Sequence, residues 1–518
     1  MVPLVALASE KYAYYKNLLS GFKVSITAGD LDSSEPWLAG CDFIIATTEK
    51  LDSLIRHGIS WLRQISLIII DEIHLLNDYK RGPTLEVLIT QLRRLSPSTR
   101  ILALSATINN AKELSNWLDA ELVTSNFRPV KLYEGISLDA TIQFEDKEGY
   151  ILKDELDPES AIAEQTMRIK KQVLFFVSSR RNAEALSERL GKVIGKFINP
   201  DDKKLLAELT EETLSALETP THQCHRLAKC IREGTAFHHA GLVAKQKRLI
   251  EDGFKKGLIK AIVATPTLAL GVNLPCFRVV IRDIKRYYPG LGSEYIPIME
   301  YKQFVGRAGR PQFDKFGESI LIAKTEREAR ILTERYIKGQ SENIDSKLAQ
   351  ESVLRMHILS LISSDLCGST DELLDFFNLT LFGFQYGDTG LLKEKIDLSL
   401  EKLNKWGFIY QEKTSLKATA LGKKISRLYL DPRTAYDFIV ALNIIQEKNN
   451  FSNLGLLQII SAAEEISPPL RLSEEEGWKL GEFISRERER FVNPLPSRWD
   501  YGFEEFLSSV KLALMFES

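Results

Sequence analysis

Two adjacent carboxylates, Asp71 and Glu72, follow an apolar run over residues 65–70 that only Ser66 interrupts. Such a run, rich in β-branched side chains, predicts a strand buried on both faces of a parallel sheet. Open α/β sheets build their ligand crevices at the carboxyl ends of strands, where these two acids are expected to lie. There one carboxylate can hold Mg²⁺ against phosphate groups, and the other can orient or deprotonate a water. The alternative is an ordinary charged turn between a strand and a helix.

A second group of candidate side chains lies in residues 303–310, where Arg307 and Arg310 are three positions apart. If this segment is helical, the two guanidinium groups share one face. Small residues such as Gly306 let the backbone approach a ligand closely. Paired guanidinium groups suit a triphosphate, whose developing charge they can stabilise. A solvated basic turn is the alternative.

The elements around these groups alternate between strands and helices, which predicts parallel sheets built from βαβ units. In the first unit, strands are expected at residues 23–27, 43–46, 65–70 and 101–104, and helices at residues 9–19 and 85–95. Thr47 can cap a further helix. In a second unit, after a polar stretch at residues 139–158, strands are expected at residues 172–177, 260–263, 279–284 and 319–323. A mostly helical insertion occupies about residues 182–234.

From about residue 340 onward the pattern is mainly helical. Ser369 and Glu372 have the spacing of a capping box. A core-facing helix stripe follows, formed by Leu392, Ile396, Leu400 and Leu403. Residues 408–410 and 417–419 can pair as a small hairpin, and helices with such a wing indicate a winged-helix module. After Asp431 and Pro432 the chain reads as helices joined by Pro-rich turns.

The composition bounds the function. The chain of 518 residues carries 68 Lys and Arg against 70 Asp and Glu, so any nucleic-acid site must be a local basic surface. Five scattered cysteines fit a reducing compartment. No apolar run approaches the roughly 18–20 residues that span a bilayer, and no signal peptide is recognisable at residues 1–12. We expect a cytoplasmic protein without a membrane partner.

Seven segments carry a more specific pattern when they are taken in order: residues 3–12, 46–50, 71–74, 105–107, 176–180, 264–275 and 303–310. They resemble motifs Ia, Ib, II, III, IV, V and VI of a superfamily 2 helicase. Residues 237–242, 272–275 and 309–314 resemble the Ski-two-like branch. Residues 354–360 and 420–426 extend the likeness to the archaeal Hjm-type DNA repair helicases, relatives of the polymerase theta helicase domain.

This resemblance implies an α/β fold class with two RecA-like parallel-sheet domains, the first one incomplete, followed by a winged-helix domain and part of a helical bundle. The expected boundaries are 1–135 for the first RecA-like domain, 136–340 for the second with a β-hairpin at about 282–297, 341–432 for the winged helix and 433–518 for a partial helical (ratchet) domain.

The resemblance also implies roles for single residues. Asp71 would bind Mg²⁺ and Glu72 would activate water. Arg307 and Arg310 would reach the γ-phosphate of ATP from the second RecA-like domain. Other residues follow by motif: Gln303, Gly306 and Gly271 near the nucleotide; Ser105 and Thr107 in coupling hydrolysis to domain closure; Pro3, Thr47, Ser178, Arg180 and Thr265 along single-stranded DNA.

Basic and aromatic residues interleave between motifs V and VI, as Lys285, Arg286, Tyr287 and Tyr288, before Pro289. In the family this position holds the β-hairpin that parts the duplex. An aromatic residue or proline at its tip can wedge against the last base pair, because unstacking requires an apolar face. The alternative is a packed aromatic loop.

The family's Gly-rich phosphate loop is expected shortly upstream of motif Ia, whereas this sequence opens at motif Ia. We therefore expect the true start to lie upstream, or the gene to be cut short, and this chain alone to hydrolyse little or no ATP. We also expect the C-terminal end to be truncated, because the family's helical domain continues beyond the amphipathic stretch at residues 506–515.

The leading hypothesis is the motor of an ATP-dependent DNA helicase, present as a fragment, which translocates on single strands and unwinds forks or repair intermediates. ATP and Mg²⁺ are the expected cofactors, and single-stranded and forked DNA the expected partners of a monomer. Two alternatives stand beside it. One is an RNA helicase of the same branch, and the other is a non-catalytic nucleic-acid-binding scaffold that has lost ATP binding.

Overall fold

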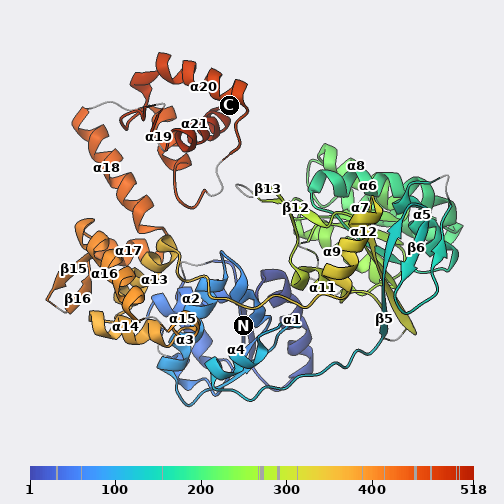
Figure 1. Cartoon of the computed structure of the whole chain (residues 1–518), viewed down its shortest axis with the longest axis horizontal. Coiled ribbons are helices and arrows are strands. Elements are labelled where there is room, and N and C mark those ends of the chain that lie inside the picture. Colours follow the sequence, from blue (N-terminus) through green and yellow to red (C-terminus); the bar gives the residue numbers. More distant parts are fainter. Residues whose placement is uncertain are drawn as a thin grey trace. The chain divides into compact units, whose positions relative to one another are not determined.

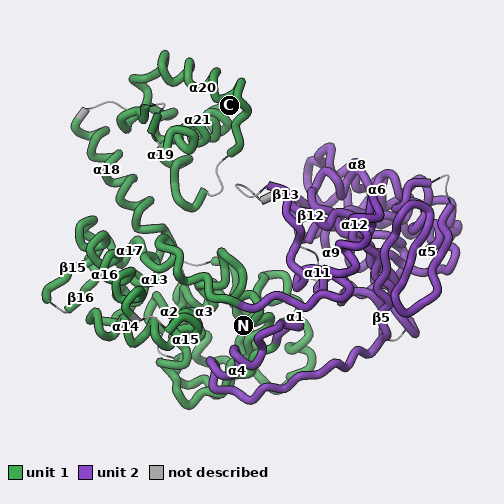
Figure 2. The backbone as a smooth tube through the Cα atoms, viewed as in Figure 1, with its two compact units in different colours: residues 1–104, 345–518 green, residues 105–344 purple. Residues whose placement is uncertain are grey.

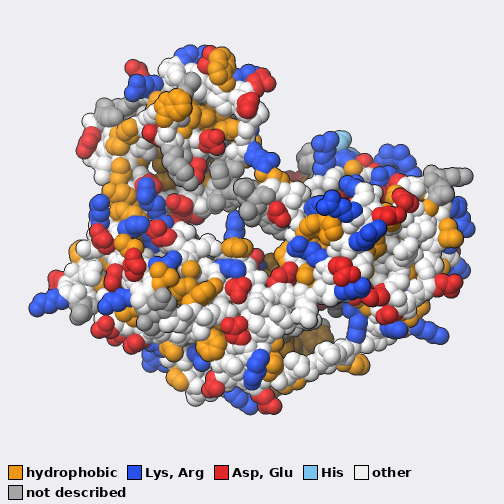
Figure 3. Space-filling model, viewed as in Figure 1, with side chains coloured by type: hydrophobic (Ala, Val, Ile, Leu, Met, Phe, Trp, Pro, Cys, Tyr) orange, Lys and Arg blue, Asp and Glu red, His pale blue; other side chains and the backbone are white. Residues whose placement is uncertain are grey.

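A computed structural model gives the fold of the chain (Figure 1). It describes residues 1–30, 33–59, 61–153, 156–266, 268, 274–288, 292–311, 313–387, 389–413, 415–448, 452–466, 470–497, 499–500 and 502–518. The backbone divides into two compact units (Figure 2), one formed by residues 1–104 and 345–518 and the other by residues 105–344. Lys and Arg side chains are interspersed with Asp and Glu over the visible face (Figure 3), as the small net charge of −2 leads one to expect.

The first unit begins with two parallel pairs of strands. Strand β1 (Val24–Thr27) pairs with β2 (Phe43–Ala46), and β3 (Leu67–Ile70) pairs with β4 (Arg100–Ala103). The first two residues lie between these pairs. Val2 donates its N–H to the Ala46 carbonyl, and Met1 bonds with both Ile69 and Asp71. The four expected strands are therefore present, each within a few residues of its predicted bounds.

Three helices accompany these strands: α1 (Val5–Leu18), α2 (Thr48–Arg56) and α3 (Gly82–Leu95). The hydroxyl of Thr47 accepts the N–H of Lys50, so the predicted cap of α2 is confirmed. Helix α1 begins four residues earlier than predicted. Its N-terminal residue Val5 is exposed and has no side-chain cap before it, so no capping residue marks this start in the sequence.

The rest of the first unit is helical apart from one hairpin. Its elements are α13 (Glu351–Ser363), α14 (Thr370–Asn378), α15 (Leu381–Tyr386), α16 (Thr389–Lys405), β15 (Ile409–Glu412), β16 (Ser415–Ala418), α17 (Ala420–Arg427), α18 (Pro432–Lys448), α19 (Asn453–Ser461), α20 (Glu474–Arg486) and α21 (Phe503–Glu517). The α16 stripe is buried and β15 pairs antiparallel with β16, both as predicted. Ser369 caps α14, but only half of the predicted capping box is formed, because the Glu372 carboxylate accepts the N–H of Gly368. The long helix α18 leads from this group to α19–α21 (Figure 1).

The second unit contains an eight-stranded sheet in the order β7-β6-β5-β14-β11-β8-β10-β9. Its strands are β5 (Lys131–Leu138), β6 (Thr141–Phe144), β7 (Tyr150–Ile151), β8 (Val173–Phe176), β9 (Thr235–His238), β10 (Ala261–Ala264), β11 (Arg278–Ile281) and β14 (Phe316–Ile322). The run from β5 to β9 is parallel, and β6 and β7 extend it antiparallel. The described helices are α4 (Ala111–Leu118), α5 (Pro158–Arg168), α6 (Arg180–Ile194), α7 (Pro200–Leu214), α8 (His222–Arg232), α9 (Ala244–Lys255), α11 (Ile298–Val305) and α12 (Glu326–Leu332).

Two sequence-based expectations for this sheet are wrong. The boundary at 135/136 falls inside β5, which pairs along its length with β14 and so belongs to the second sheet. The second unit does not start after the polar stretch at residues 139–158, because that stretch contains β6 and β7 of its sheet. Polar residues are tolerated there because Lys147 and Tyr150 both bond to Glu318, which also pairs with the fully buried Arg278. The insertion at residues 182–234 is helical, as predicted.

Candidate nucleotide and nucleic-acid sites

Asp71 and Glu72 lie directly after β3, at the carboxyl end of the sheet strand, as the sequence predicts. The ammonium group of Lys11 is 3.7 Å from Asp71 Oδ2, and one fifth of the Asp71 side chain is exposed. A partly exposed carboxylate at a sheet edge matches the oxygen ligands that Mg²⁺ prefers. Asp71 is therefore able to hold this cation.

Glu72 has a left-handed backbone conformation, with φ 58° and ψ 47°. For a residue other than glycine this costs on the order of 1–3 kcal/mol, and such strain clusters at functional sites. The Glu72 carboxylate lies 3.3 Å from Nδ1 of His74. Burial lowers the pKa of His74 to about 4, against the opposing effect of Asp71, so the ring is neutral at pH 7. In the tautomer that carries its proton on Nδ1, His74 can donate to the Glu72 carboxylate and orient it, and the carboxylate can still accept a proton.

The segments of motifs Ia and Ib are joined by a residue that the sequence did not single out. Arg81 donates from Nε to Glu49 at 2.8 Å and from Nη2 to the carbonyl of Pro3. Pro3 and Thr47 are both buried, and the oxygen of Thr47 already accepts the Lys50 N–H. Its hydroxyl proton is not used in that bond. Nothing in the sequence around Arg81 indicates this role, because its partners are fixed only by the fold.

The winged-helix elements hold α2 from the other end. The Tyr429 hydroxyl donates to Asp52 at 2.5 Å, and the guanidinium group of Arg56 lies 4.0 Å from the centre of the Tyr429 ring. Arg56 also donates to Asp52 and to the carbonyl of Ser426. Ser426 and Tyr429 lie 370 or more positions after their partners Arg56 and Asp52, so no local pattern predicts these contacts. They position the helix that begins with motif Ib.

A buried carboxylate connects α3 to residues 346 and 382 of the same unit. Glu86 in α3 accepts hydrogen bonds from the Ser346 hydroxyl at 2.6 Å and from the Phe382 N–H at 2.7 Å. Burial raises the pKa of Glu86 to about 7, although the bonds from Ser346, Phe382 and Thr380 act against the rise. The proton on Glu86 is therefore exchanged near neutral pH.

We expect Glu86→Gln to gain stability relative to the parent as pH rises from about 5 to 8. Between about pH 4.5 and pH 7 the folded chain keeps a proton that the unfolded chain has lost, so the parent's free energy of unfolding falls through this window. The fall amounts to about 3 kcal/mol, whereas a Gln amide does not titrate. Urea unfolding at a series of pH values measures the difference. The exposed Glu475→Gln is the control, and parallel curves for parent and Glu86→Gln would contradict the expectation.

The residues of motif VI lie at the end of α11 in the second unit. The helix ends at Val305, Gly306 and Arg307 form a turn, and Gly309 has a φ of 90°. A Cβ at Gly309 would meet Val130 at 2.6 Å, so the turn requires glycine. The expectation that Arg307 and Arg310 share one helical face is therefore wrong, because the chain turns between them.

Arg310 is held within its own unit. It donates to Asp314 at 2.9 Å and to the Gln172 side chain at 2.9 Å, and Asp314 also pairs with Lys171. Burial acts to raise the pKa of Asp314, but Arg310 and Lys171 outweigh it and hold that pKa below its ordinary value. Gln303 and Arg307 are half-buried and Gly306 is exposed. Gly271 lies outside the described residues.

Two candidate DNA contacts follow neighbouring strands of the same sheet. Ser178 follows β8, and Thr265 follows β10 directly. Because these two strands are parallel and paired, both residues lie at the carboxyl ends of neighbouring strands. Thr265 is buried, and its N–H donates to the carbonyl of His238. Arg180, at the start of α6, is exposed. Both the N–H and the hydroxyl of Ser178 donate to Asp283, which the sequence did not single out.

The motif III residues Ser105 and Thr107 are exposed and follow β4 by two and four positions. Beyond them Asn110 bonds in both directions with Ile344: its Nδ2 donates to the Ile344 carbonyl, and its Oδ1 accepts the Ile344 N–H. The two ends of the second unit are thus bonded to each other.

A hairpin lies where the sequence suggests one. Strand β12 (Lys285–Tyr288) pairs antiparallel with β13 (Gly292–Tyr295). The Lys285 ammonium group lies 4.5 Å from the centre of the Tyr295 ring, and Arg286 pairs with Glu300 in α11. The Tyr287 side chain is 42% exposed. Pro289 and the side chain of Tyr288 lie outside the described residues.

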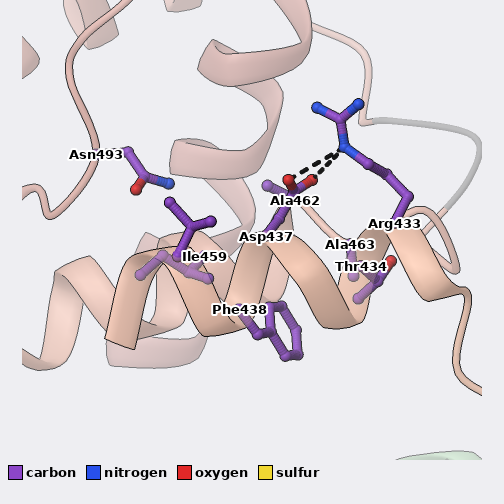
Figure 4. Close-up of a pocket in the computed structure, with 9 residues that line it drawn as sticks. Arg433, Thr434, Asp437, Phe438, Ile459, Ala462, Ala463 and Asn493 are labelled. Carbon is purple, nitrogen blue, oxygen red and sulfur yellow. Dashed lines mark hydrogen bonds and ion pairs between the residues drawn. The ribbon is translucent and has the colours of Figure 1, made fainter. Parts of the chain in front are cut away.

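A hollow elsewhere in the first unit is shown in Figure 4. Its lining comes from α18, from α19 and the two residues after it, and from Asn493, and the lining residues Arg433 and Asp437 pair at 2.9 Å. None of the candidate residues named above is among the described residues that line it.

Family models match three parts of the chain: DEAD/DEAH box helicase at residues 1–114, helicase conserved C-terminal domain at residues 159–312 and helix-turn-helix domain at residues 317–410. The ATP-dependent DNA helicase Hel308 of Methanocella arvoryzae is 39% identical over the whole chain, which covers 70% of that relative. The chain belongs to the Hel308 family. The Hel308 proteins of Pyrococcus abyssi and Pyrococcus horikoshii are 40% and 42% identical over 100% and 90% of the chain, which covers 70% and 64% of them.

Membership of the Hel308 family confirms the resemblance to Ski-two-like superfamily 2 helicases. It also confirms the α/β fold class, with two RecA-like domains followed by a winged-helix domain and further helices. The chain spans about two thirds of the length of the Hel308 relatives that it matches. Among the described helices none is both long enough and apolar enough to cross a bilayer.

Proposed function

We propose that this Hel308-family chain is the motor of an ATP-dependent DNA helicase that moves along single-stranded DNA and unwinds forked or repair intermediates. The observation that carries the proposal is the acid pair after β3, in which a strained, oriented Glu72 stands beside the partly exposed Asp71. We further propose that the protein acts as a monomer in the cytoplasm.

Each residue has a role in this proposal. Asp71 holds Mg²⁺, which neutralises charge on the bound ATP. Glu72 takes the proton of the attacking water, and Arg307 and Arg310 stabilise the charge that develops on the γ-phosphate, with Gln303, Gly306 and Gly271 near the nucleotide. Ser105 and Thr107 couple hydrolysis to movement.

The DNA strand is held through its backbone, which hydroxyls, amides and a few cations can bind without a strongly basic surface. Arg180 and Thr265 serve this purpose in the second unit, and Pro3 and Thr47 in the first. Ser178 lies in the same segment as Arg180, but its N–H and hydroxyl both donate to Asp283. The near-zero net charge of the chain is compatible with such contacts.

Stimulation of ATP hydrolysis by matched DNA and RNA oligonucleotides tests the proposal, on the gene product that carries this chain. We expect stimulation by single-stranded DNA and unwinding of a forked DNA. Stronger stimulation by RNA would favour an RNA helicase of the same branch. Nucleic-acid binding without any hydrolysis would favour a scaffold.

We expect Tyr287→Ala to lower the rate of DNA unwinding roughly tenfold, because one stacked aromatic residue contributes about 1–3 kcal/mol per base. DNA-stimulated ATP hydrolysis should persist, since Tyr287 belongs to the hairpin. Tyr386→Ala, at a similarly exposed tyrosine on α15, is the control. Parallel loss of unwinding and hydrolysis in Tyr287→Ala would count against a wedge.

A further inference from the structure

The base of the hairpin is bonded to the segment that follows β8. Strands β8 and β11 are neighbours in parallel register, with Phe176 opposite Ile281. Ser178 and Asp283 each lie two residues beyond the end of their strand, so they are side by side at the carboxyl ends of β8 and β11. The register places a candidate DNA contact beside the residue from which the hairpin departs.

One carboxylate oxygen makes this connection. Asp283 Oδ2 accepts the Ser178 N–H at 2.9 Å, the Ser178 hydroxyl at 3.0 Å and the Asn182 side-chain amide at 3.0 Å. Hydrogen bonds to a charged acceptor are about twice as strong as neutral ones. Asn182 lies in the first turn of α6, where a negative charge is also favoured by the helix dipole.

The chain beyond Asp283 leads at once into the hairpin. Ile284 is buried, and its carbonyl accepts the N–H of Ile296, which closes the hairpin at its base. Strand β12 begins at the next residue, Lys285. On the far side Arg286 pairs with Glu300, so the hairpin is fixed at two points, to α11 through Arg286 and to the β8–α6 segment through Asp283.

A small hollow unites the three segments. Ser178, Asp283 and Pro266 all contribute to its wall, together with Lys285 and Arg286 of the hairpin. Pro266 follows Thr265, the candidate DNA contact after β10. Both protein segments of this unit that are proposed to bind the DNA backbone therefore lie beside the base of the hairpin.

We propose that Asp283 is a positioning residue that fixes the duplex-parting hairpin to the strand-holding segment at Ser178, so that movement of the held strand is transmitted to the hairpin. This proposal rests on the proposed function for its consequence in unwinding. Its structural content, the attachment of the hairpin base, does not depend on activity.

Hydrogen exchange on Asp283→Ala tests the attachment. We expect the amides of β12, β13 and Ile296 to exchange about tenfold faster, as the loss of hydrogen bonds to a charged group implies. The amides of β8 and β10 should keep their rates. Asp283→Asn retains one acceptor oxygen but loses the charge, so its exchange rates should lie between those of the parent and those of Asp283→Ala. Asp202→Ala is the matched control, since Asp202 is equally exposed and pairs with Lys260 elsewhere in the unit.

The ratio of base pairs unwound to ATP hydrolysed tests the consequence. At saturating single-stranded DNA we expect Asp283→Ala to keep its maximal rate of hydrolysis within about twofold and to lose about tenfold in unwinding, the factor for one charged hydrogen bond. Asp202→Ala should change neither.

Three results would overturn the proposal: unchanged hairpin exchange, faster exchange across the whole unit, or equal loss of hydrolysis and unwinding. If the unaltered protein neither hydrolyses ATP with DNA nor unwinds it, the proposed function fails. The exchange rates then still decide whether Asp283 holds the hairpin.

Discussion

Replacement of Glu72 by Gln is expected to lower DNA-stimulated ATP hydrolysis by roughly 10²–10⁴-fold, the usual contribution of a positioned general base. Gln keeps the length and shape of the side chain and can still bond with His74 Nδ1, which lies 3.3 Å from the carboxylate. It cannot accept a proton from water. Affinity for Mg²⁺ and ATP should persist, because Asp71 is intact.

Steady-state hydrolysis with a saturating oligonucleotide measures this loss, on the gene product that carries the chain, and a fluorescent ATP analogue measures binding. The fold is checked by thermal unfolding. Glu475→Gln, at an exposed residue of α20 that pairs with Lys479, should behave as the parent. Hydrolysis within tenfold of the parent in Glu72→Gln would remove the water-activating role from Glu72.

The acid pair was predictable because its signal is local. Residues 65–70 are almost wholly apolar, and the polar pair follows directly, so the strand end could be assigned from the sequence. The left-handed backbone of Glu72 could not, since glutamate has no preference for that conformation.

Strand β5 escaped prediction for the opposite reason. Its sequence from Lys131 to Leu138 mixes charged, aromatic and small residues, and Glu134 finds partners in Tyr301 and Lys302 of α11. A strand whose polar side chains are paired across the fold carries no apolar run. Its existence depends on β14, almost two hundred residues later in the chain.

The contacts of Asp52, Arg56 and Tyr429 show the same limit on the site itself. No local sequence pattern marks any of these residues as important. They contact one another only because α17 and the residues after it pack against α2. The motif residues were recognisable by their order along the chain, whereas the residues that position them were not. Resemblance identifies the groups that touch ligands better than the groups that hold them.

The two arginines of motif VI are expected to differ when each is replaced by Ala. Arg310→Ala should lower the free energy of unfolding of the second unit by about 1.5–3 kcal/mol, the range for hydrogen bonds to a charged group. The substitution leaves Asp314, whose side chain is fully buried, with Lys171 as its remaining ion-pair partner. It also removes the hydrogen bond that Arg310 donates to the side-chain oxygen of Gln172. Because the pKa of Asp314 lies below its ordinary value, this loss should be full at neutral pH. It should shrink as pH falls from the ordinary pKa of an aspartate, about 3.9, through the lower pKa of the folded carboxyl.

Arg307→Ala should leave the free energy of unfolding near that of the parent and lower hydrolysis on the order of 10³-fold or more, as for removal of an arginine finger. Arg310→Ala, which also removes a proposed γ-phosphate contact, should lower both hydrolysis and stability. Arg307 lies on the turn after α11, and it is not one of the cations, Arg310 and Lys171, that pair with Asp314 (the Asp314 cluster). Urea unfolding followed by exchange of the β11 and β14 amides measures stability, and DNA-stimulated hydrolysis measures chemistry. Arg330→Ala, which breaks an exposed pair with Glu326, should change neither, since such surface pairs contribute about 0–1 kcal/mol. Equal stability of Arg310→Ala and the parent would show that the Asp314 cluster does not anchor motif VI, and both arginines would then have to be assigned to the nucleotide alone.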